Sequence, residues 1–436
     1  MTISPLFKRV VAGMGANAYG QAVTILIQLA SLPIFLSRWD LKTYGVWLTL
    51  SAIPAYLSIA DVGMVTIASN RMSMMIGAKD TKGANRIFQS AQLFVLSSCL
   101  LVAFVTLPLI ALAPLEALSN PDARLALSAL VICVLLSMMS GLSGAVFKAT
   151  QRYATGTGLE VTARLLEWLG AMLGLVLYGS FTGVALGMLL VRITALLTIG
   201  YLSTRRQSEF SWGGHAAASQ EIRDMIKPSL GFMVFPIGNA LSIQGFTLLT
   251  AHLLGPAAVA IFNTYRTLAR LAIQVTSILS HALWPEFSRL FGARKYDSLK
   301  SIFYRAALLG FFGSALLSFL IYLAGPMILE LWTHGKIEFL PYAMGLLLLY
   351  AAVGGFWHVP RVLLMSTNNH TRLGVIYLIV SAFSLIAAWP LGEWKSIAGL
   401  VVSMIISELL MTATCFWMAA QLLRHELQDH KTNKGI

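Results

Sequence analysis

The sequence predicts an all-α integral membrane protein with about twelve transmembrane helices in two six-helix bundles, and three observations support this. Charged residues make up only 11% of the 436 residues, whereas a soluble domain carries about 25%. Mean hydropathy is +0.75, and apolar runs long enough to cross a bilayer recur along the whole chain. Basic residues gather in alternate connections between these runs, as in polytopic proteins.

The apolar runs predict twelve spans. The first run is too long for the apolar core of a signal peptide and lacks a clear cleavage site. No stretch alternates polar and apolar residues for long enough to form a transmembrane barrel. The expected spans are 10–36, 43–68, 88–112, 125–148, 158–178, 182–203, 228–253, 256–283, 303–325, 340–364, 372–390 and 395–422.

The distribution of basic residues predicts the topology. The connections on one side carry 22 of the 31 lysines and arginines, the opposite side carries five, and four arginines lie inside spans. Because basic connections stay in the cytoplasm, both termini are expected to be cytoplasmic. An even number of spans agrees with this.

The two halves of the chain resemble each other. The longest polar connection, about 204–227, divides it into a predicted N-terminal bundle, 1–212, and a C-terminal bundle, 213–436. The loop Gly77–Phe88 after span two aligns without gaps with Gly292–Phe303 after span eight, sharing Gly, Ala, a basic residue, Ile and Phe. Because six spans per half is an even number, we expect a parallel repeat with its pseudo-twofold axis along the membrane normal. A cleft between the bundles and alternating access follow from this arrangement.

Several short motifs resemble those of the multidrug/oligosaccharidyl-lipid/polysaccharide (MOP) exporter superfamily. Together with the span number and the duplication, the resemblance covers essentially the whole chain. It rests on Tyr44-Gly45-Val46-Trp47, Gly77-Ala78-Lys79, Leu254-Gly255-Pro256, Tyr265-Arg266 and Trp284-Pro285-Glu286-Phe287. The nearest likeness is to the polysaccharide transporter branch, the Wzx-type O-antigen flippases.

The resemblance implies a MATE/MurJ-like fold in the bacterial inner membrane. It also implies a substrate, a polyprenyl-diphosphate-linked oligosaccharide from O-antigen, capsule or exopolysaccharide synthesis, which would move from the cytoplasmic to the periplasmic leaflet. The expected partners are this lipid-linked substrate, membrane lipids, and a glycan polymerase or other glycan-assembly proteins. No nucleic-acid partner is expected.

Arginines inside the spans are the strongest candidates for substrate binding. Arg266 and Arg270 lie near the middle of span eight, where an arginine costs at least about 2.5–3.5 kcal/mol. A guanidinium pairs well with phosphate oxygens, so we expect both, with Asn263 and with Arg192 of span six, to bind the diphosphate. Arg192 and Arg266 should then face one central cavity. The alternatives are that one arginine, Arg270 rather than Arg266, bonds within its own bundle, and that Arg192 pairs with a residue such as Glu167.

Span five carries three charged residues. Glu160, Arg164 and Glu167 are spaced four and three residues apart, which places them on one helix face. This spacing favours an ion-pair ladder within the helix. In the alternative hypothesis the two glutamates act in gating or coupling and Arg164 contacts the substrate.

Three further polar residues lie inside spans. Asn17 and Gln21 share a face of span one, and they line a substrate cavity or join helices by hydrogen bonds. Glu408 is isolated in span twelve and is the best single candidate for a proton- or cation-coupling carboxylate. The alternative for Glu408 is a helix–helix hydrogen bond.

A different substrate class remains open, whereas an enzyme is not expected. A proton- or sodium-coupled exporter of organic cations would have the same fold but would place unpaired acids in its cavity. The periplasmic connections are short, and the sequence has no phosphate loop, metal cluster or nucleophile triad. The three cysteines lie within spans and suggest no disulfide framework or metal site. We therefore expect no cofactor and no metal, and an energy source other than direct use of ATP.

Overall fold

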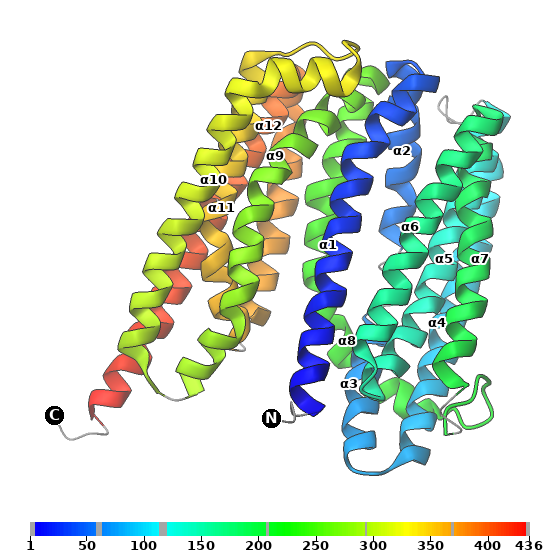
Figure 1. Cartoon of the computed structure of the whole chain (residues 1–436), viewed down its shortest axis with the longest axis vertical. Coiled ribbons are helices and arrows are strands. Elements are labelled where there is room, and N and C mark those ends of the chain that lie inside the picture. Colours follow the sequence, from blue (N-terminus) through cyan, green and yellow to red (C-terminus); the bar gives the residue numbers. More distant parts are fainter. Residues whose placement is uncertain are drawn as a thin grey trace. The chain divides into compact units, whose positions relative to one another are not determined.

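The computed structural model describes residues 5–57, 63–112, 120–205, 209–292, 294–367 and 370–432, and the regular elements of this part are helices (Figure 1). Long apolar sequences form them because a helix satisfies its backbone hydrogen bonds within one segment. The elements are α1 (Pro5–Arg38), α2 (Leu41–Leu57), α3 (Met64–Gly77), α4 (Thr81–Leu112), α5 (Pro121–Ala149), α6 (Tyr153–Tyr178), α7 (Phe181–Thr204), α8 (Ser219–Ala240), the π-helix η3 (Leu241–Gly245), α9 (Phe246–Gly292), α10 (Tyr296–Thr333), α11 (Pro341–Ser366) and α12 (His370–Thr432).

Nine helices in the described part are long and apolar enough to cross a membrane. Two of them are broken where the sequence predicts that spans end. The backbone leaves the helical conformation at Gly255 inside α9 and at Lys395 and Ser396 inside α12. Helix α12 therefore supplies two of the expected spans, whereas α9 supplies the eighth span and only the end of the seventh, which begins in α8. Helices α2 and α3 flank residues 58–62, which lie outside the described part, in the region of the second expected span.

The chain forms two compact units. The first comprises Met1–Asp40 and Val46–Pro236, and the second comprises Leu41–Gly45 and Ile237–Ile436. In the second unit, α9, α10, α11 and α12 pack side by side (Figure 1). The sequence places the boundary after residue 212, whereas the first unit extends through most of α8 to Pro236.

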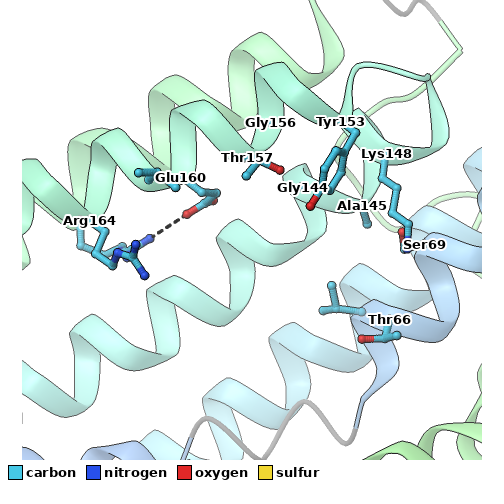
Figure 2. A pocket seen from close by; sticks show the side chains of 13 residues that line it. Thr66, Ser69, Gly144, Ala145, Lys148, Tyr153, Gly156, Thr157, Glu160 and Arg164 are labelled. Carbon is cyan, nitrogen blue, oxygen red and sulfur yellow. Dashed lines mark hydrogen bonds and ion pairs between the residues drawn. The ribbon is translucent and has the colours of Figure 1, made fainter. Parts of the chain in front are cut away.

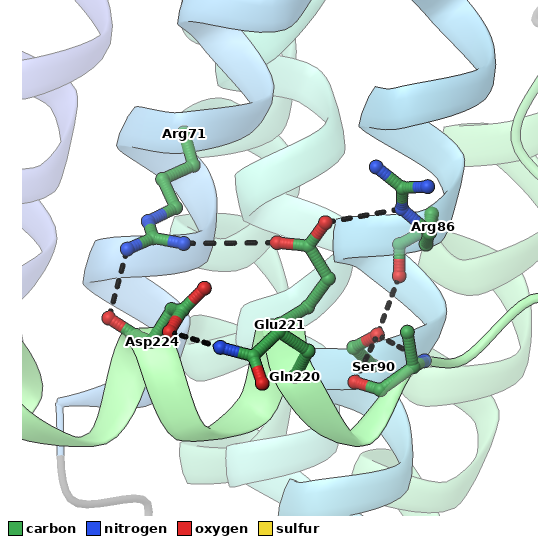
Figure 3. Close-up of polar contacts among 7 residues, drawn as sticks. Arg71, Arg86, Ser90, Gln220, Glu221 and Asp224 are labelled. Carbon is green, nitrogen blue, oxygen red and sulfur yellow. Dashed lines mark hydrogen bonds and ion pairs between the residues drawn. The ribbon is translucent and has the colours of Figure 1, made fainter.

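Aromatic and polar contacts explain why the linker belongs to the first unit. The ring of Trp212 packs edge-on against Phe88 of α4 with centroids 5.1 Å apart. Glu221, at the start of α8, accepts a hydrogen bond from Arg86 at 3.0 Å and lies 3.7 Å from Arg71 (Figure 3). The side chains of Arg71 and Arg86 are 31% and 51% exposed, so each ion pair contributes at most about 1 kcal/mol. The linker is thus held mainly by packing, with the ion pairs fixing its position.

The predicted duplication is visible in the backbone of the basic loops. Lys79 and Arg294, which align in the sequence, both adopt the left-handed conformation with φ of 64° and 55°. Each amide closes the same turn, from Lys79 to the carbonyl of Ile76 and from Arg294 to that of Phe291, both at 3.0 Å. Left-handed residues of this kind end helices in a Schellman-type turn, and here it recurs at the equivalent place in each unit.

A second pair of helix ends also matches. Thr150 ends α5 by donating its amide and hydroxyl to the carbonyl of Val146, both at 2.9 Å. Thr367 ends α11 in the same way on Leu363, at 3.2 and 3.0 Å. These caps fix which residues of α5 and α11 are equivalent in the repeat.

Candidate functional site

A polar cavity of about 450 Å³ lies inside the first unit, between α3, α5, α6 and α7. Figure 2 shows Glu160 and Arg164 at one end of it and Lys148 and Ser69 at the other. Its charged and hydroxyl-bearing lining comes from Thr66, Ser69, Lys148, Tyr153, Thr157, Glu160, Arg164 and Arg192.

Glycines on α6 and α7 bring the charged residues of the cavity together. A Cβ added to Gly187 would overlap the carbonyl oxygen of Gly170, and a Cβ added to Gly174 would overlap that of Gly183. Small residues at such positions let two membrane helices approach closely. The close approach places Arg192 of α7 against the face of α6 that carries the glutamates.

Arg192 is held by ion pairs across this interface. It is 7% exposed, and its guanidinium lies 2.5 Å from Glu167 and 3.5 Å from Glu160. Glu160 also accepts a hydrogen bond from the hydroxyl of Ser140. A buried guanidinium without a partner would be strongly destabilising. Of the two hypotheses for Arg192, the structure therefore shows the ion pair with Glu167, while Arg192 also lines the cavity of its own unit.

The expected ladder Glu160–Arg164–Glu167 within α6 was wrong. Arg164 instead donates to the carbonyl of Gly20 at 3.0 Å and to the hydroxyl of Thr24 at 2.9 Å, both on α1. The spacing correctly gave a shared helix face, but spacing within one helix does not show which neighbouring helix supplies a stronger partner. Here α7 supplies Arg192 to the two glutamates, and α1 supplies neutral acceptors to Arg164.

The cavity consequently carries excess positive charge. Its lining contains three basic side chains and one acidic one. Glu167 beside Arg192 adds a second acidic side chain, so three basic and two acidic side chains leave one excess positive charge. Arg164 binds only the neutral acceptors on α1 described above, and Lys148 binds the neutral amide oxygen of Asn70 at 3.3 Å. Ser69 is 4% exposed and its hydroxyl has no partner among the described residues, so it can accept or donate to a molecule in the cavity.

Lys148, Tyr153 and Ser69 were missed by the sequence analysis. Lys148 lies near the end of its span and is one of the 22 basic residues in the connections expected to be cytoplasmic. The feature of the sequence that could have indicated its role is the position of Lys148 at the end of the span that precedes the charged span five.

The polar residues of α1 have different surroundings. Asn17 accepts a hydrogen bond from the hydroxyl of Tyr153 on α6 at 3.1 Å, which is a helix–helix contact to a residue of the cavity wall. Gln21 is half-buried one turn further along α1. A role for either residue in substrate binding stays a prediction.

In the second unit, the side chain of Arg266 is hydrogen-bonded to residues of η3 and of its own helix α9. It is 6% exposed and donates to the carbonyl of Ile243 and the hydroxyl of Thr247, both at 2.8 Å, and to the amide oxygen of Asn263. Ile243 lies in the π-helix η3. Such a segment interrupts the regular α-helical hydrogen-bond pattern, and Arg266 supplies an additional donor there.

Arg270 differs from Arg266 in a way that corrects one alternative. Arg270 is the arginine expected from the sequence to bond within its own bundle, whereas in the structure Arg266 does so. Arg270 is half-buried and makes no hydrogen bond or ion pair with another described residue. Each turn of α9 faces a different environment, and Arg266 finds its acceptors on Ile243 of η3 and on Thr247 and Asn263 of α9 itself.

Glu408 forms the centre of a second polar cluster. Its carboxylate accepts hydrogen bonds from the indole of Trp357 and the hydroxyl of Tyr350, both on α11. It lines a small cavity of about 20 Å³ together with Ser242, Tyr350, Tyr377, Ser381 and Ser407, which is enough for about one water molecule. The helix–helix hydrogen bond expected as one alternative is therefore present.

Within the ranges that the structure describes, no group of three or more His, Cys, Asp or Glu residues could hold a metal ion.

Comparison with known proteins establishes the fold. No protein-family profile matches the sequence, and no curated protein matches it. An inward-facing multidrug resistance MATE family transporter of the MOP superfamily superposes with a TM-score of 0.72 at 15% identity, covering 93% of this chain and 99% of that one. An outward-facing MATE transporter gives 0.65 at 15% identity, covering 96% of each chain.

A third similar structure is a MOP superfamily transporter from Pyrococcus furiosus, for which reverse polarity of the binding pocket suggests a different function. It gives a TM-score of 0.66 at 16% identity and 96% coverage of both chains. At such low identity these likenesses show the fold alone. The chain has the all-α, multi-pass membrane fold of the MATE transporters, as the sequence predicted. This fold does not separate the Wzx-type branch from the other branches of the superfamily.

Proposed function

We propose that this chain, built on the MATE transporter fold, is a flippase that moves a polyprenyl-diphosphate-linked oligosaccharide across the membrane by alternating access. The observation that carries the proposal is the excess positive charge of the cavity in the first unit. Lys148 and Arg164 are its two basic groups whose described partners are neutral. Such groups attract a diphosphate and disfavour an organic cation.

The cavity matches the chemistry of the polar end of this substrate. Arg164 and Lys148 can each donate charge-assisted hydrogen bonds to phosphate oxygens. Tyr153, Thr157 and the unpartnered hydroxyl of Ser69 can bind sugar hydroxyls. A volume of about 450 Å³ suits the diphosphate and the sugars next to it, while the isoprenoid tail would stay in the lipid.

The polarity of the binding pocket differs among proteins of this fold. Reverse polarity of the binding pocket has been connected with a different function in the Pyrococcus furiosus transporter. In this chain the basic lining of the first unit's cavity favours an anionic substrate over an organic cation.

The test is a flipping assay in proteoliposomes. A fluorescent polyprenyl-diphosphate oligosaccharide is placed in both leaflets, and an impermeant reductant bleaches the outer leaflet, so flipping appears as loss of the protected fraction. Replacing Arg164 or Lys148 with alanine should slow flipping about tenfold, because loss of one charge-assisted hydrogen bond costs about 1.5–3 kcal/mol. The matched control is Arg124→Ala, which removes an arginine outside the cavity lining from α5. Unchanged flipping in the Lys148→Ala/Arg164→Ala double variant would refute the proposal.

Export of organic cations is a second candidate, and one observation favours it. Glu408 has no basic side chain within ion-pairing distance among the described residues, and an uncompensated acid attracts cations. An exporter of this kind would carry a lipophilic cation such as tetraphenylphosphonium out of proteoliposomes against a proton or sodium gradient. The Glu408→Gln variant would abolish this transport.

A further inference from the structure

A groove of the second unit lies between α10 and α11, which pack side by side (Figure 1). Its volume is about 290 Å³. At about 30 Å³ for each non-hydrogen atom, which is the share of a water molecule in the liquid, it holds about ten carbon atoms. The lining is apolar apart from two hydroxyl groups, and it consists of Ser318, Phe319 and Tyr322 of α10 and Gly345, Leu348, Leu349 and Ala352 of α11.

The sequence forms this groove by placing small residues on one face of α11. The four α11 residues of the lining follow the i, i+3, i+4, i+7 spacing of a single helix face, and two of them, Gly345 and Ala352, are small. One turn beyond Ala352 the helices are in close contact, since a Cβ added to Gly355 would lie 2.5 Å from the Cβ of Ser314. Towards the other end, the ring of Tyr322 lies 3.4 Å from the position of a Cβ on Gly345. The groove is therefore a hollow with defined ends.

One polar side chain of the groove lacks a partner. Ser318 is 5% exposed, and its hydroxyl makes no hydrogen bond with another described residue. The hydroxyl of Ser314, one turn earlier on α10, donates to the carbonyl of Ala351 at 2.9 Å. Ser318 lines the groove instead. Because a buried hydroxyl without a hydrogen bond costs free energy, the groove suits an apolar ligand that also offers an acceptor.

Ser318 lies near the middle of its membrane span. The charged residues that flank it on α10 are Arg305 and Glu330, which are both exposed and lie 25 residues apart. At about 1.5 Å per residue this stretch is about 37 Å long, which matches a hydrocarbon core of about 30 Å and its borders. Ser318 lies 13 residues from Arg305 and 12 from Glu330. The groove therefore reaches the midplane of the bilayer.

This depth distinguishes two classes of lipid chain. The acyl chains of a phospholipid span one leaflet and end near the midplane in saturated carbon. A polyprenyl chain is longer than one leaflet, and each isoprene unit carries a methyl branch and a carbon–carbon double bond. A double bond can accept a weak hydrogen bond from a hydroxyl. The methyl branches fit where glycine and alanine leave the helix surface hollow, and the unsaturated carbons pack on aromatic rings.

We therefore infer that the groove binds the isoprenoid tail of the lipid-linked substrate, an inference that rests on the proposed function. Ser318 supplies the hydrogen bond, and Phe319 and Tyr322 supply the aromatic contacts. Phe319 and Leu349 are 58% and 49% exposed, so a chain can enter the groove sideways from the lipid. The tail then stays in the lipid while a short stretch of it is held against α10 and α11.

The test is photolabelling of the full chain in nanodiscs by a polyprenyl phosphate that carries a diazirine in its tail. After irradiation, mass spectrometry of peptides locates the label. We expect label on residues 318–322 and 345–352. An excess of unlabelled polyprenyl phosphate should reduce this labelling about tenfold by mass action, whereas the same excess of a phospholipid with monounsaturated chains should not.

Two variants separate the shape of the groove from its hydroxyl. Gly345→Leu extends a side chain towards Tyr322 and should reduce labelling of the groove about tenfold. The matched control is Gly313→Leu on α10, where nothing lies within 4 Å of an added Cβ and the residue does not line the groove, and its labelling should equal that of wild type. Ser318→Ala keeps the shape and removes only a weak hydrogen bond, so the reduction should be about threefold.

Three results would overturn the inference: label spread evenly over the lipid-exposed helices, groove labelling that persists in Gly345→Leu, or equal competition by the phospholipid. If Gly345→Leu does not fold, the competition with wild-type protein decides alone. Labelling requires binding but no transport. Specific labelling of the groove without flipping in proteoliposomes would therefore count against the proposed function and not against the tail site.

Discussion

Arg192 of α7 forms a buried ion pair with Glu167 of α6, whose carboxylate lies 2.5 Å from the guanidinium. Arg192 also lies 3.5 Å from Glu160, so it has two carboxylate partners, whereas Glu408 is bonded by the neutral side chains of Trp357 and Tyr350. In the proposed function, the first unit provides the basic cavity for the substrate.

Breaking the ion pairs of Arg192 should destabilise the first unit. Arg192→Leu leaves two glutamates facing an apolar side chain, and loss of one partner of a buried ion pair costs about 3–5 kcal/mol. We expect a clearly lower melting temperature in fluorescence-detected thermal unfolding. The triple variant Arg192→Leu/Glu160→Gln/Glu167→Gln removes the uncompensated charges and should recover most of the loss. If the triple variant is no more stable than Arg192→Leu, the ion pair is not what stabilises this interface.

The glycines between α6 and α7 should be intolerant of larger residues. Gly187→Val would push the helices apart, because its side chain would occupy the place of the carbonyl of Gly170. We expect loss of folded protein in size-exclusion chromatography. Gly158→Ala on α6 is the control, since nothing lies within 4 Å of its added Cβ, and it should behave as wild type. Normal folding of Gly187→Val would show that the close approach is not required.

Arg266 and Arg270 should respond differently to substitution. Arg266→Ala leaves the acceptors of Ile243, Thr247 and Asn263 without their donor, and an unsatisfied buried polar group costs about 1–3 kcal/mol. Arg270→Ala removes a side chain without a bonded partner in the described part of the chain and should leave the melting temperature unchanged. Thermal unfolding of both purified variants measures this difference. Equal loss of stability in the two variants would contradict the assignment of Arg266 to a structural role.

The contribution of Lys148 to substrate binding should depend on its charge rather than on its shape. Lys148→Arg keeps the positive charge at the end of the cavity, whereas Lys148→Gln keeps similar length without charge. We expect the substrate concentration that gives half-maximal flipping to change little in Lys148→Arg. In Lys148→Gln this concentration should rise about tenfold, which corresponds to about 1.4 kcal/mol of binding free energy. Equal behaviour of both variants would place Lys148 outside the substrate path.

The fold could be predicted from the sequence because membrane helices follow from hydropathy. The breaks at Gly255 and at Lys395–Ser396 fall at predicted span ends, since glycine and polar residues there interrupt apolar runs. The basic loops around Lys79 and Arg294 also revealed the repeat before their matching backbone was seen.

The candidate site was harder to predict because contacts between helices determine which side chains meet there. The sequence showed that Glu160, Arg164 and Glu167 share a face, but not that α7 faces the glutamates and α1 the arginine. It also gave no indication of η3, whose carbonyl at Ile243 fixes Arg266 rather than Arg270. The importance of Lys148 was hidden because a lysine at a span end looks like a topology signal.

The most direct test of the proposed function measures transport of two probes of opposite charge in the same proteoliposomes. One is a fluorescent polyprenyl-diphosphate oligosaccharide, and the other is tetraphenylphosphonium. The basic cavity predicts protein-dependent flipping of the anionic lipid, lost in Lys148→Ala/Arg164→Ala and kept in Arg124→Ala, with no protein-dependent movement of the cation. Export of tetraphenylphosphonium without flipping of the lipid would contradict the proposal.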